Sequence, residues 1–212
     1  MSTNHHGLAE HQRRRFDPAR AQRLDDPARF AYLSIADVVA CVDAPPKGVV
    51  VDFGAGTGTY AIPFAQARPD CTVVAIDLQP EMLEMLRAKP GADRVRSGTP
   101  EMLSRFAGTI DRVFAINVLH ELDDAHLRDL FAALAPSARA IFIDWNADVE
   151  RPAGPAKENL YGPDAAERYL ATFGFVLERR QLFPYHYALL GRLDTAARAE
   201  RNTSIKPATL GE

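Results

Sequence analysis

Two acids and three glycines in the first half of the chain have the types and spacing of a cofactor site. Asp52 ends an apolar run, and Gly54, Gly56 and Gly58 follow it at alternate positions. A buried strand that leads through a glycine-rich turn into a helix N-terminus is how α/β proteins bind nucleotide-like ligands. Asp77 lies 19 residues beyond Gly58, where an acid can accept hydrogen bonds from ribose hydroxyls. The pattern therefore predicts a site for a nucleotide-like cofactor.

The spacing of the glycines separates this turn from two common phosphate-binding turns. A dinucleotide fingerprint, G-x-G-x-x-G, would place its third glycine at position 59, where this chain has Thr59. No Lys-Ser or Lys-Thr pair follows the turn, which argues against the P-loop of triphosphate-binding proteins. The acid in front of the turn, Asp52, suits a ligand with positive charge, such as the ammonium group of an amino acid.

The composition is that of an ordinary globular protein. The chain has 212 residues, of which 47% are hydrophobic and 25% charged, and this size suits one domain. A net charge of -3 offers no global basis for nucleic-acid binding. No apolar run approaches the ~20 residues of a membrane span, and residues 1–10 lack the apolar core of a signal peptide. Cys41 and Cys71 are too few for a disulfide framework, so we expect a cytoplasmic protein.

Strand and helix signals alternate along the chain. Apolar runs predict strands over residues 49–53, 72–76, 94–96, 111–117, 138–143, 176–182 and 185–190. Periodic patterns and capping residues predict helices over 27–42 and 58–67, and helices that begin near Pro80, Asp123 or Asp124, and Pro163. The last two strands are separated by Phe183-Pro184 and should form a hairpin. We therefore predict a doubly wound, mostly parallel, seven-stranded Rossmann-like sheet with an antiparallel last strand and helices on both faces.

The chain is expected to have three parts. Residues 1–26 form a flexible basic arm, 27–192 the folded domain, and 193–212 a disordered tail. Arg13, Arg14 and Arg15 precede Phe16 in the arm. The arm is either a solvated basic segment or a lid over the active site, with Phe16 near the substrate.

Four segments resemble the class I S-adenosylmethionine-dependent methyltransferases, and more narrowly the methyltransferase type 11 group related to quinone-biosynthesis methyltransferases. They are VVDFGAGTGTYAIPFA at 50–65, VVAIDLQPEML at 73–83, IDRVFAINVLHELDD at 110–124 and IFIDWNAD at 141–148. The resemblance runs from about residue 15 to 191, and the first segment is the most specific. It implies that the chain is a methyltransferase with S-adenosyl-L-methionine as its cofactor.

The resemblance also implies which residues hold this cofactor. In chain order they are Asp52, Gly54, Ala55, Gly56, Thr57, Gly58, Asp77, Leu78, Ser97, Gly98, Thr99, Pro100 and Asn117. The turn, Asp52 and Asn117 would hold the methionine part, Asp77 the ribose and Leu78 the adenine face. Residues 97–100 would lie at the adenine edge, although Thr99 replaces an acid that many relatives have near this position.

Methyl transfer needs an aligned acceptor and, for some acceptors, a base, but no metal and no covalent nucleophile. His120 follows the fourth predicted strand and is the candidate base, because a histidine titrates near neutral pH. Its alternative role is structural. Phe16, Asp144 and Trp145 are the other candidate substrate contacts, and Trp145 would either stack on a flat acceptor or pack in the core.

Three functions remain open at this point. The chain is expected to be an S-adenosylmethionine-dependent methyltransferase that acts on a small molecule by in-line transfer. An NAD-type oxidoreductase would share the turn and Asp77, but Thr59 and Asp52 argue against it. A binding module that keeps the cofactor and transfers nothing is the third. The sequence makes no prediction of the acceptor, of the atom that is methylated or of the oligomeric state.

Overall fold

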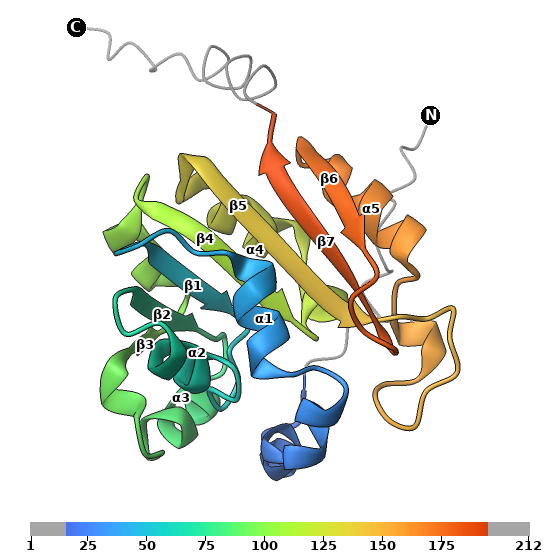
Figure 1. The fold of residues 1–212 in the computed structure, drawn as a ribbon, viewed down its shortest axis with the longest axis horizontal. Helices are drawn as coiled ribbons and strands as arrows, with labels where there is room; N and C mark the ends of the chain where they lie inside the picture. Colours follow the sequence, from blue (N-terminus) through green and yellow to red (C-terminus); the bar gives the residue numbers. More distant parts are fainter. Residues whose placement is uncertain (1–15, 195–212) are drawn as a thin grey trace, which may run out of the picture.

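A computed structural model describes residues 16–194 of the chain. Predictions that fall on 1–15 and 195–212, including the three consecutive arginines and most of the tail, lie outside the described residues. The described chain forms one seven-stranded sheet with helices on both faces (Figure 1). The strands are β1 (Val49–Phe53), β2 (Thr72–Ile76), β3 (Val95–Gly98), β4 (Ile110–Ile116), β5 (Leu134–Trp145), β6 (Phe175–Arg180) and β7 (His186–Leu193).

The strand order is β3-β2-β1-β4-β5-β7-β6. The first five strands pair in parallel, and β7 inserts antiparallel between β5 and β6. This confirms the predicted doubly wound sheet with an antiparallel last strand. β5 begins at Leu134, four residues before the predicted start, with a register shift against β4 between Ile110 and Arg112. Because β1, β2, β4 and β5 are parallel, their carboxyl ends meet at one edge of the sheet.

Five α-helices and several 3-10 segments surround the sheet. The α-helices are α1 (Ile35–Val42), α2 (Ala61–Ala67), α3 (Pro80–Arg87), α4 (Asp124–Ala132) and α5 (Pro163–Ala171). The 3-10 segments are η2 (Pro18–Asp25), η3 (Pro27–Ala31), η4 (Ala92–Arg94), η5 (Pro100–Phe106), η6 (Leu119–Glu121) and η7 (Lys157–Asn159). None of the helices within the described residues is long and apolar enough to cross a membrane.

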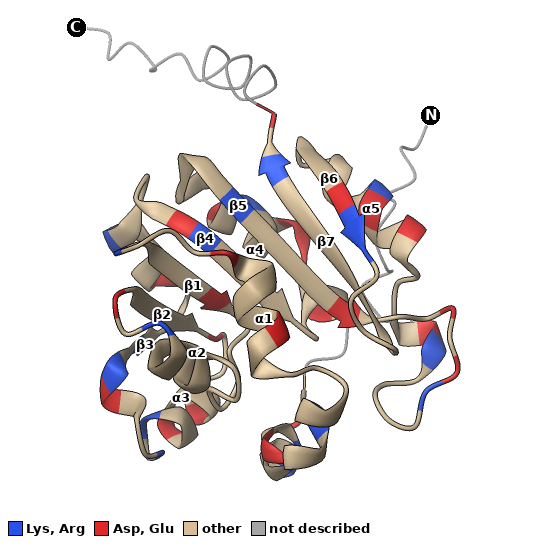
Figure 2. Cartoon of the chain, in the orientation of Figure 1, with Lys and Arg blue, Asp and Glu red and all other residues tan. Residues whose placement is uncertain are grey.

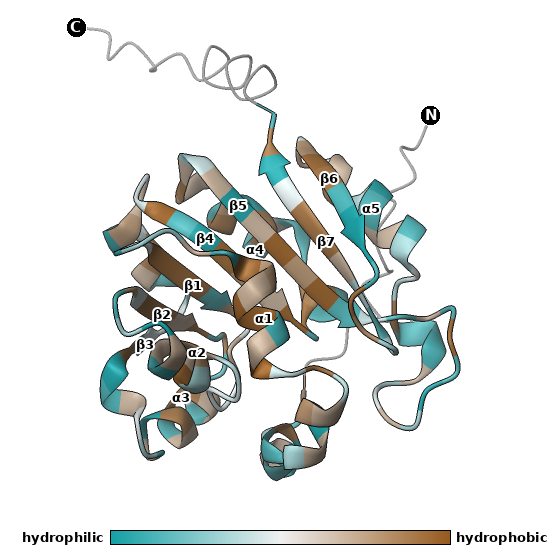
Figure 3. Cartoon of the chain, in the orientation of Figure 1, coloured by the Kyte–Doolittle hydropathy of each residue, from teal (hydrophilic) through white to brown (hydrophobic). Residues whose placement is uncertain are grey.

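Alternate residues of β1, β2, β4, β5 and β7 pack into two apolar cores, one on each face of the sheet. In β1, Val51 and Phe53 belong to the core shared with α4 and α5, whereas Val50 belongs to the core shared with α1 and α2. β1, β2, β4 and β5 are accordingly apolar along most of their length in Figure 3. Burial on both faces explains why these strands are near-continuous apolar runs. Acidic residues interrupt them at the carboxyl-terminal tips of β1 and β5 (Figure 2).

Two predicted helices differ from the observed ones. The segment 27–42 is broken into η3 and α1, because the Ser34 hydroxyl caps a new helix by accepting a hydrogen bond from the Asp37 N–H at 3.1 Å. The helix predicted from Gly58 begins three residues later, at Ala61. Gly58 has φ of 78° and continues the turn. The predicted helix starts at Pro80, at Asp123 as the cap of α4, and at Pro163 are confirmed.

The described part of the predicted arm lies against the domain. Asp25, at the end of η2, accepts a hydrogen bond from the Thr57 hydroxyl at 2.8 Å and pairs with Lys89. The Thr59 hydroxyl donates to the Leu24 carbonyl at 3.0 Å. Leu24 and Asp25, at the end of η2, are therefore bonded to the residues of the glycine turn. The predicted boundaries at 26 and 192 remain predictions.

Candidate cofactor site

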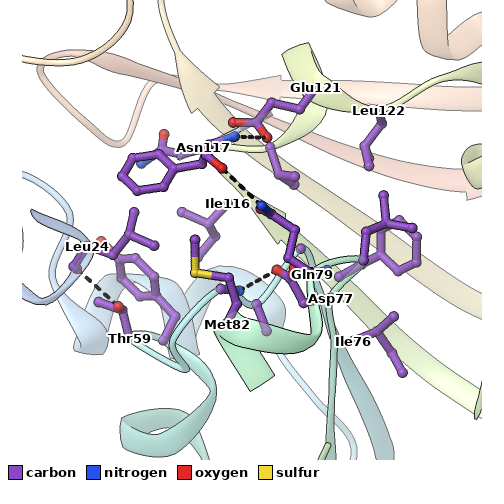
Figure 4. Close-up of a pocket in the computed structure, with 18 of the residues that line it drawn as sticks. Leu24, Thr59, Ile76, Asp77, Gln79, Met82, Ile116, Asn117, Glu121 and Leu122 are labelled. Atoms are coloured by element: carbon purple, nitrogen blue, oxygen red, sulfur yellow. Dashed lines mark hydrogen bonds between the residues drawn. The ribbon is translucent and has the colours of Figure 1, made fainter. Parts of the chain in front are cut away.

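One cavity lies at the carboxyl ends of β1, β2 and β4, under η2 and η3 (Figure 4). The space inside it is about 850 Å³ including the open mouth. It is lined by Phe16, Leu24, Arg29, Phe53, Gly54, Ala55, Gly56, Thr59, Tyr60, Ile76, Asp77, Leu78, Gln79, Met82, Pro100, Ile116, Asn117, Val118, Glu121 and Leu122. In open α/β sheets ligands bind at the carboxyl ends of the parallel strands, and the cavity lies at this edge.

The glycine turn forms one wall of the cavity. Gly54 and Gly56 have φ of 79° and 53°, in the left-handed region that side chains resist. The N–H groups of Gly54 and Ala55 donate to the Ile76 carbonyl at 2.8 and 3.0 Å, so the turn is bonded to the end of β2. A Cβ on Gly56 would lie 3.1 Å from Leu24 Cδ1. The absence of a side chain at Gly56 therefore lets Leu24 of η2 pack close to the turn.

Asp77 lies on the wall next to the turn, as predicted. Its Oδ2 accepts from the Gly56 N–H at 2.7 Å and its Oδ1 from the Gln79 N–H at 2.9 Å. Burial raises the pKa of Asp77, and these backbone donors oppose that shift. Each carboxylate oxygen can accept more than one hydrogen bond. Asp77 is thus held rigidly and keeps acceptor capacity toward the cavity, as a ribose diol requires.

Asp52 lies behind the turn and not on the cavity wall. It is 2% exposed, and burial followed by the charge of Asp77 raises its pKa well above the usual value. Thr57 and Gly58 also face away from the cavity: Thr57 bonds to Asp25, and a Cβ on Gly58 would lie 2.7 Å from Leu86. The turn residues that line the cavity are Gly54, Ala55 and Gly56.

At the predicted adenine end, Leu78 and Pro100 line the cavity. Ser97, Gly98 and Thr99 are absent from the described lining. The Ser97 hydroxyl accepts from Arg87 Nε at 3.0 Å, and the Thr99 hydroxyl donates to Glu101. Contacts of these three residues with adenine stay predictions.

Asn117 supplies an unused acceptor on the opposite wall. It follows β4 with φ of 57°, and its N–H donates to the Ile143 carbonyl at 2.8 Å. Its Oδ1 is buried and has no hydrogen-bond partner among residues 16–194. A buried acceptor without a partner costs free energy until a donor arrives. With Asp77 and the bare turn, Asn117 fits a ligand that brings both a ribose and a donor such as an ammonium group.

The predicted base, His120, is not on the cavity wall. It is 4% exposed, and its Nδ1 lies 2.9 Å from Asp144 Oδ2. Burial disfavours its protonation, but the charge and hydrogen bond of Asp144 raise the pKa of His120 above its usual value. Asp144 is 1% exposed and also accepts from the Trp145 N–H at 2.7 Å. The structure thus buries His120 and Asp144 behind the wall, and this geometry does not support direct contact of either with a substrate.

Trp145 packs in an aromatic cluster away from the cavity, with Tyr32, Tyr185 and His186. Its ring centroid lies 4.1 Å from that of His186, and 5% of the residue is exposed. Packing, the alternative role for Trp145, is what the structure shows. Phe16 is the predicted substrate contact that does line the cavity.

His186 provides a test of this cluster. Burial lowers the pKa of His186 to about 4, and neither ring nitrogen has a hydrogen-bond partner within the described chain. Below pH 6.5 the histidine is protonated in the unfolded chain but stays neutral in the folded protein. We therefore expect His186 to lower the free energy of unfolding by about 1 kcal/mol per pH unit, down to about pH 4. Urea unfolding of the wild type and His186→Phe from pH 7 to 4.5 measures this term. If the free energies of unfolding of the two proteins changed with pH in parallel, this assignment to His186 would be contradicted.

Five polar residues of the wall were not among the predicted site residues: Arg29, Thr59, Tyr60, Gln79 and Glu121. The signal for Glu121 was its place directly after His120, since a single 3-10 turn sends neighbouring side chains in different directions. Gln79 follows Asp77 by two residues and donates through Nε2 to the Phe16 carbonyl at 3.1 Å. Arg29 and Tyr60 come from η3 and the turn before α2, and no local pattern joins them.

The fold and the cavity together define a Rossmann-like protein that binds an adenosyl cofactor. A family model described as methyltransferase domain matches residues 50–139. Over 138 residues the chain is 31% identical to the O-methyltransferase pyvH of Aspergillus violaceofuscus, covering 61% of this chain and 32% of that protein. Over 130 residues it is 32% identical to the methyltransferase str2 of Strobilurus tenacellus, covering 58% and 46%. The chain therefore spans less than half of these relatives' lengths.

A solved structure covers more of the chain. The S-adenosylmethionine-dependent methyltransferase from Aquifex aeolicus is 25% identical, with a TM-score of 0.75 over 84% of this chain and 98% of that one. The family model, the curated relatives and this solved structure together support a class I S-adenosylmethionine-dependent methyltransferase of the type 11 kind. Its cofactor is S-adenosylmethionine.

Proposed function

We propose that the chain transfers the methyl group of S-adenosylmethionine, in line, to a small-molecule acceptor. The observation that carries this proposal is that one cavity is lined by the glycine turn, by Asp77 and by Asn117, whose buried amide oxygen has no hydrogen-bond partner in the described chain. Net charge of -3 favours a small molecule over a nucleic acid as the acceptor. A cytosolic location goes with the proposal. One relative is named an O-methyltransferase, so hydroxyl compounds are the first acceptors to test.

The chain's own residues would bind, orient and enclose the reactants. Asp77 would accept from the ribose hydroxyls, and Asn117 from the ammonium group. Phe16 and Leu24, which line the cavity from the segment before η3, would exclude water from the reacting atoms. The cofactor supplies the activated methyl group, so the protein's main task is alignment.

Arg29 is the candidate partner of the cofactor's carboxylate. Among the described residues that line the cavity it is the positively charged one, and its Nε is buried with no hydrogen-bond partner in the described chain. A guanidinium pairs with carboxylates through two parallel hydrogen bonds.

The variant Arg29→Met is expected to weaken binding of S-adenosylmethionine about tenfold, because one charge-assisted pair is lost. Isothermal titration calorimetry measures the change, with Arg23→Met on the exposed side of η2 as the matched control. An affinity equal to that of Arg23→Met would remove Arg29 from the carboxylate site.

The proposed function is tested by calorimetry with S-adenosylmethionine and S-adenosylhomocysteine, followed by labelled-methyl transfer to panels of phenols, amines, thiols and small acids. Binding without transfer to any compound would favour a cofactor-binding module. Transfer to one panel would identify the acceptor class.

A further inference from the structure

We propose that Glu121 is a catalytic residue of this cavity: the general base that takes the proton of an acceptor hydroxyl during methyl transfer. The inference rests on the proposed methyl transfer and goes beyond it, since it names the base and the acceptor class. The role of general base, which the sequence predicted for the preceding residue, His120, is thereby assigned to Glu121.

The position of Glu121 sets it apart from the other acids near the cavity. It ends η6, the single turn that follows the carboxyl end of β4, and its side chain lines the cavity with 17% exposed. Asp52 and Asp144 are 2% and 1% exposed and lie behind the wall. Asp77 also lines the cavity, but two backbone N–H groups fix its carboxylate and its remaining acceptor capacity is assigned to the ribose hydroxyls. Glu121 is the other carboxylate on the described cavity wall, and the Phe16 N–H engages its Oε2.

Two contacts hold the Glu121 carboxylate. Its Oε2 accepts from the Phe16 N–H at 3.0 Å, and its Oε1 lies 3.7 Å from His120 Nε2. His120 is in turn fixed through Nδ1 by Asp144. The buried pair behind the wall therefore orients Glu121, so His120 and Asp144 act as positioning residues.

The electrostatic surroundings move the pKa of Glu121 toward neutral pH. Burial raises the pKa of Glu121 to about 7, with His120 and the Phe16 N–H opposing the shift and Asp144 and Asp77 adding to it. Arg29 is the further charged group on the described cavity wall. A base with a pKa near the working pH combines a useful ionised fraction with enough basicity to accept a proton.

The neighbouring wall selects the acceptor. Phe16, Met82, Val118 and Leu122 give the cavity that Glu121 lines an apolar surface. This surface suits a flat or aliphatic body that carries one hydroxyl, as in a phenol or enol. In the transfer step the acceptor oxygen forms a bond to the methyl carbon, and the electron pair of the C–S bond leaves on sulfur. The O–H electron pair stays on the acceptor oxygen, and the proton goes to a Glu121 oxygen.

The positive charge on the reacting sulfur should also interact with the Glu121 carboxylate. The cofactor's sulfur lies between its methionine part, assigned to the turn, and its ribose, assigned to Asp77. The charge of Asp77 already acts on Glu121, so a positive sulfonium beside Asp77 should do so too. S-adenosylmethionine carries this charge and S-adenosylhomocysteine does not. Ionised Glu121 should therefore favour the first ligand over the second as the pH rises through about 7.

The first arm of the test needs no acceptor. Calorimetry gives the dissociation constants of S-adenosylmethionine and S-adenosylhomocysteine from pH 5.5 to 8.5 for the wild type, Glu121→Gln and the control Glu84→Gln on the exposed face of α3. We expect the preference for S-adenosylmethionine to rise about tenfold across this range in the wild type and control, as one pK unit of coupling. Glu121→Gln should show a flat ratio, with S-adenosylhomocysteine bound within about twofold of wild type because no contact to it is lost.

The second arm measures labelled-methyl transfer at about pH 8 to 4-methylphenol, which is neutral there, and to 4-nitrophenol, which is largely ionised there. Glu121→Gln should lower kcat for 4-methylphenol about 100-fold, the usual contribution of a general base. It should change kcat for 4-nitrophenol less than about threefold, because that acceptor needs no base. Glu121→Asp should restore part of the loss.

Each alternative result overturns a distinct statement. The placement of Glu121 at the reacting sulfur is overturned if the preference of the wild type for S-adenosylmethionine over S-adenosylhomocysteine does not change with pH. It is also overturned if the pH dependence of this preference persists in Glu121→Gln. Equal losses for both phenols overturn its role as the base and leave the proposed function standing. Transfer to amines or thiols alone overturns the hydroxyl class. Binding of both ligands with transfer to no compound in any panel overturns the proposed function and the base with it.

Discussion

Replacing Asp77 by asparagine is expected to weaken binding of S-adenosylmethionine about 100-fold. The carboxylate would accept two hydrogen bonds from the ribose, and bonds to a charged group contribute about 1.5–3 kcal/mol each. Asparagine keeps the shape but loses the charge and one acceptor. It also weakens the bonds that Asp77 accepts from the Gly56 and Gln79 N–H groups at 2.7 and 2.9 Å, so the turn is held less firmly.

Calorimetry with both ligands makes this test specific. S-adenosylmethionine and S-adenosylhomocysteine share the ribose, so Asp77→Asn should weaken both equally, in contrast to Glu121→Gln. The matched control is Asp93→Asn in η4, an exposed acid outside the cavity. Binding by Asp77→Asn at the affinity of this control would contradict the ribose assignment.

Placing alanine at Gly54 is expected to destabilise the domain by about 3 kcal/mol. Gly54 has φ of 79°, and a Cβ there would lie 2.4 Å from Val118 Cγ2 and 2.9 Å from Val118 Cβ. The left-handed backbone costs an alanine roughly 1–2 kcal/mol, and overpacking adds about 1–3 kcal/mol. Because Val118 leads into η6, the clash also displaces the wall that carries Glu121.

Gly108 offers a control for the backbone term. Its φ is 74°, and a Cβ there would meet no described atom within 4 Å. Gly108→Ala should therefore cost about 1 kcal/mol, and the excess in Gly54→Ala measures the clash. Urea unfolding of both variants gives the two values, and Gly54→Ala combined with Val118→Ala should recover part of the excess. Equal costs for the two alanines would show that the turn and η6 are not in tight contact.

The fold was largely predictable because its signals are local. The β2 bounds, the Pro80 and Pro163 helix starts and the Asp123 cap agree with the structure, since buried strands and helix caps depend on neighbouring residues. The prediction of one continuous helix over 27–42 was wrong, because the segment forms η3 and α1. There, Ser34 competes with the apolar stripe by capping a new helix, a choice that depends on how the segment packs against the turn before α2.

The cofactor side of the site was also predictable, though incompletely. Gly54, Ala55, Gly56, Asp77, Leu78, Pro100 and Asn117 line the cavity as expected. Asp52, Thr57, Gly58, Ser97, Gly98 and Thr99 share the same segments but are absent from the described lining. Sequence spacing placed all of them at the correct edge of the sheet, whereas the direction of each side chain depends on local dihedral angles and packing.

The sequence by itself determined the class of fold and the cofactor. The alternating glycines, the acid before them and the acid after the next strand are set by backbone geometry that few other residues can adopt. Only the tertiary structure decided which titratable groups reach the ligand. One 3-10 turn turns Glu121 toward the cavity and buries His120 against Asp144, 24 residues away. Contacts between distant segments set that choice, so no local pattern in the sequence contains it.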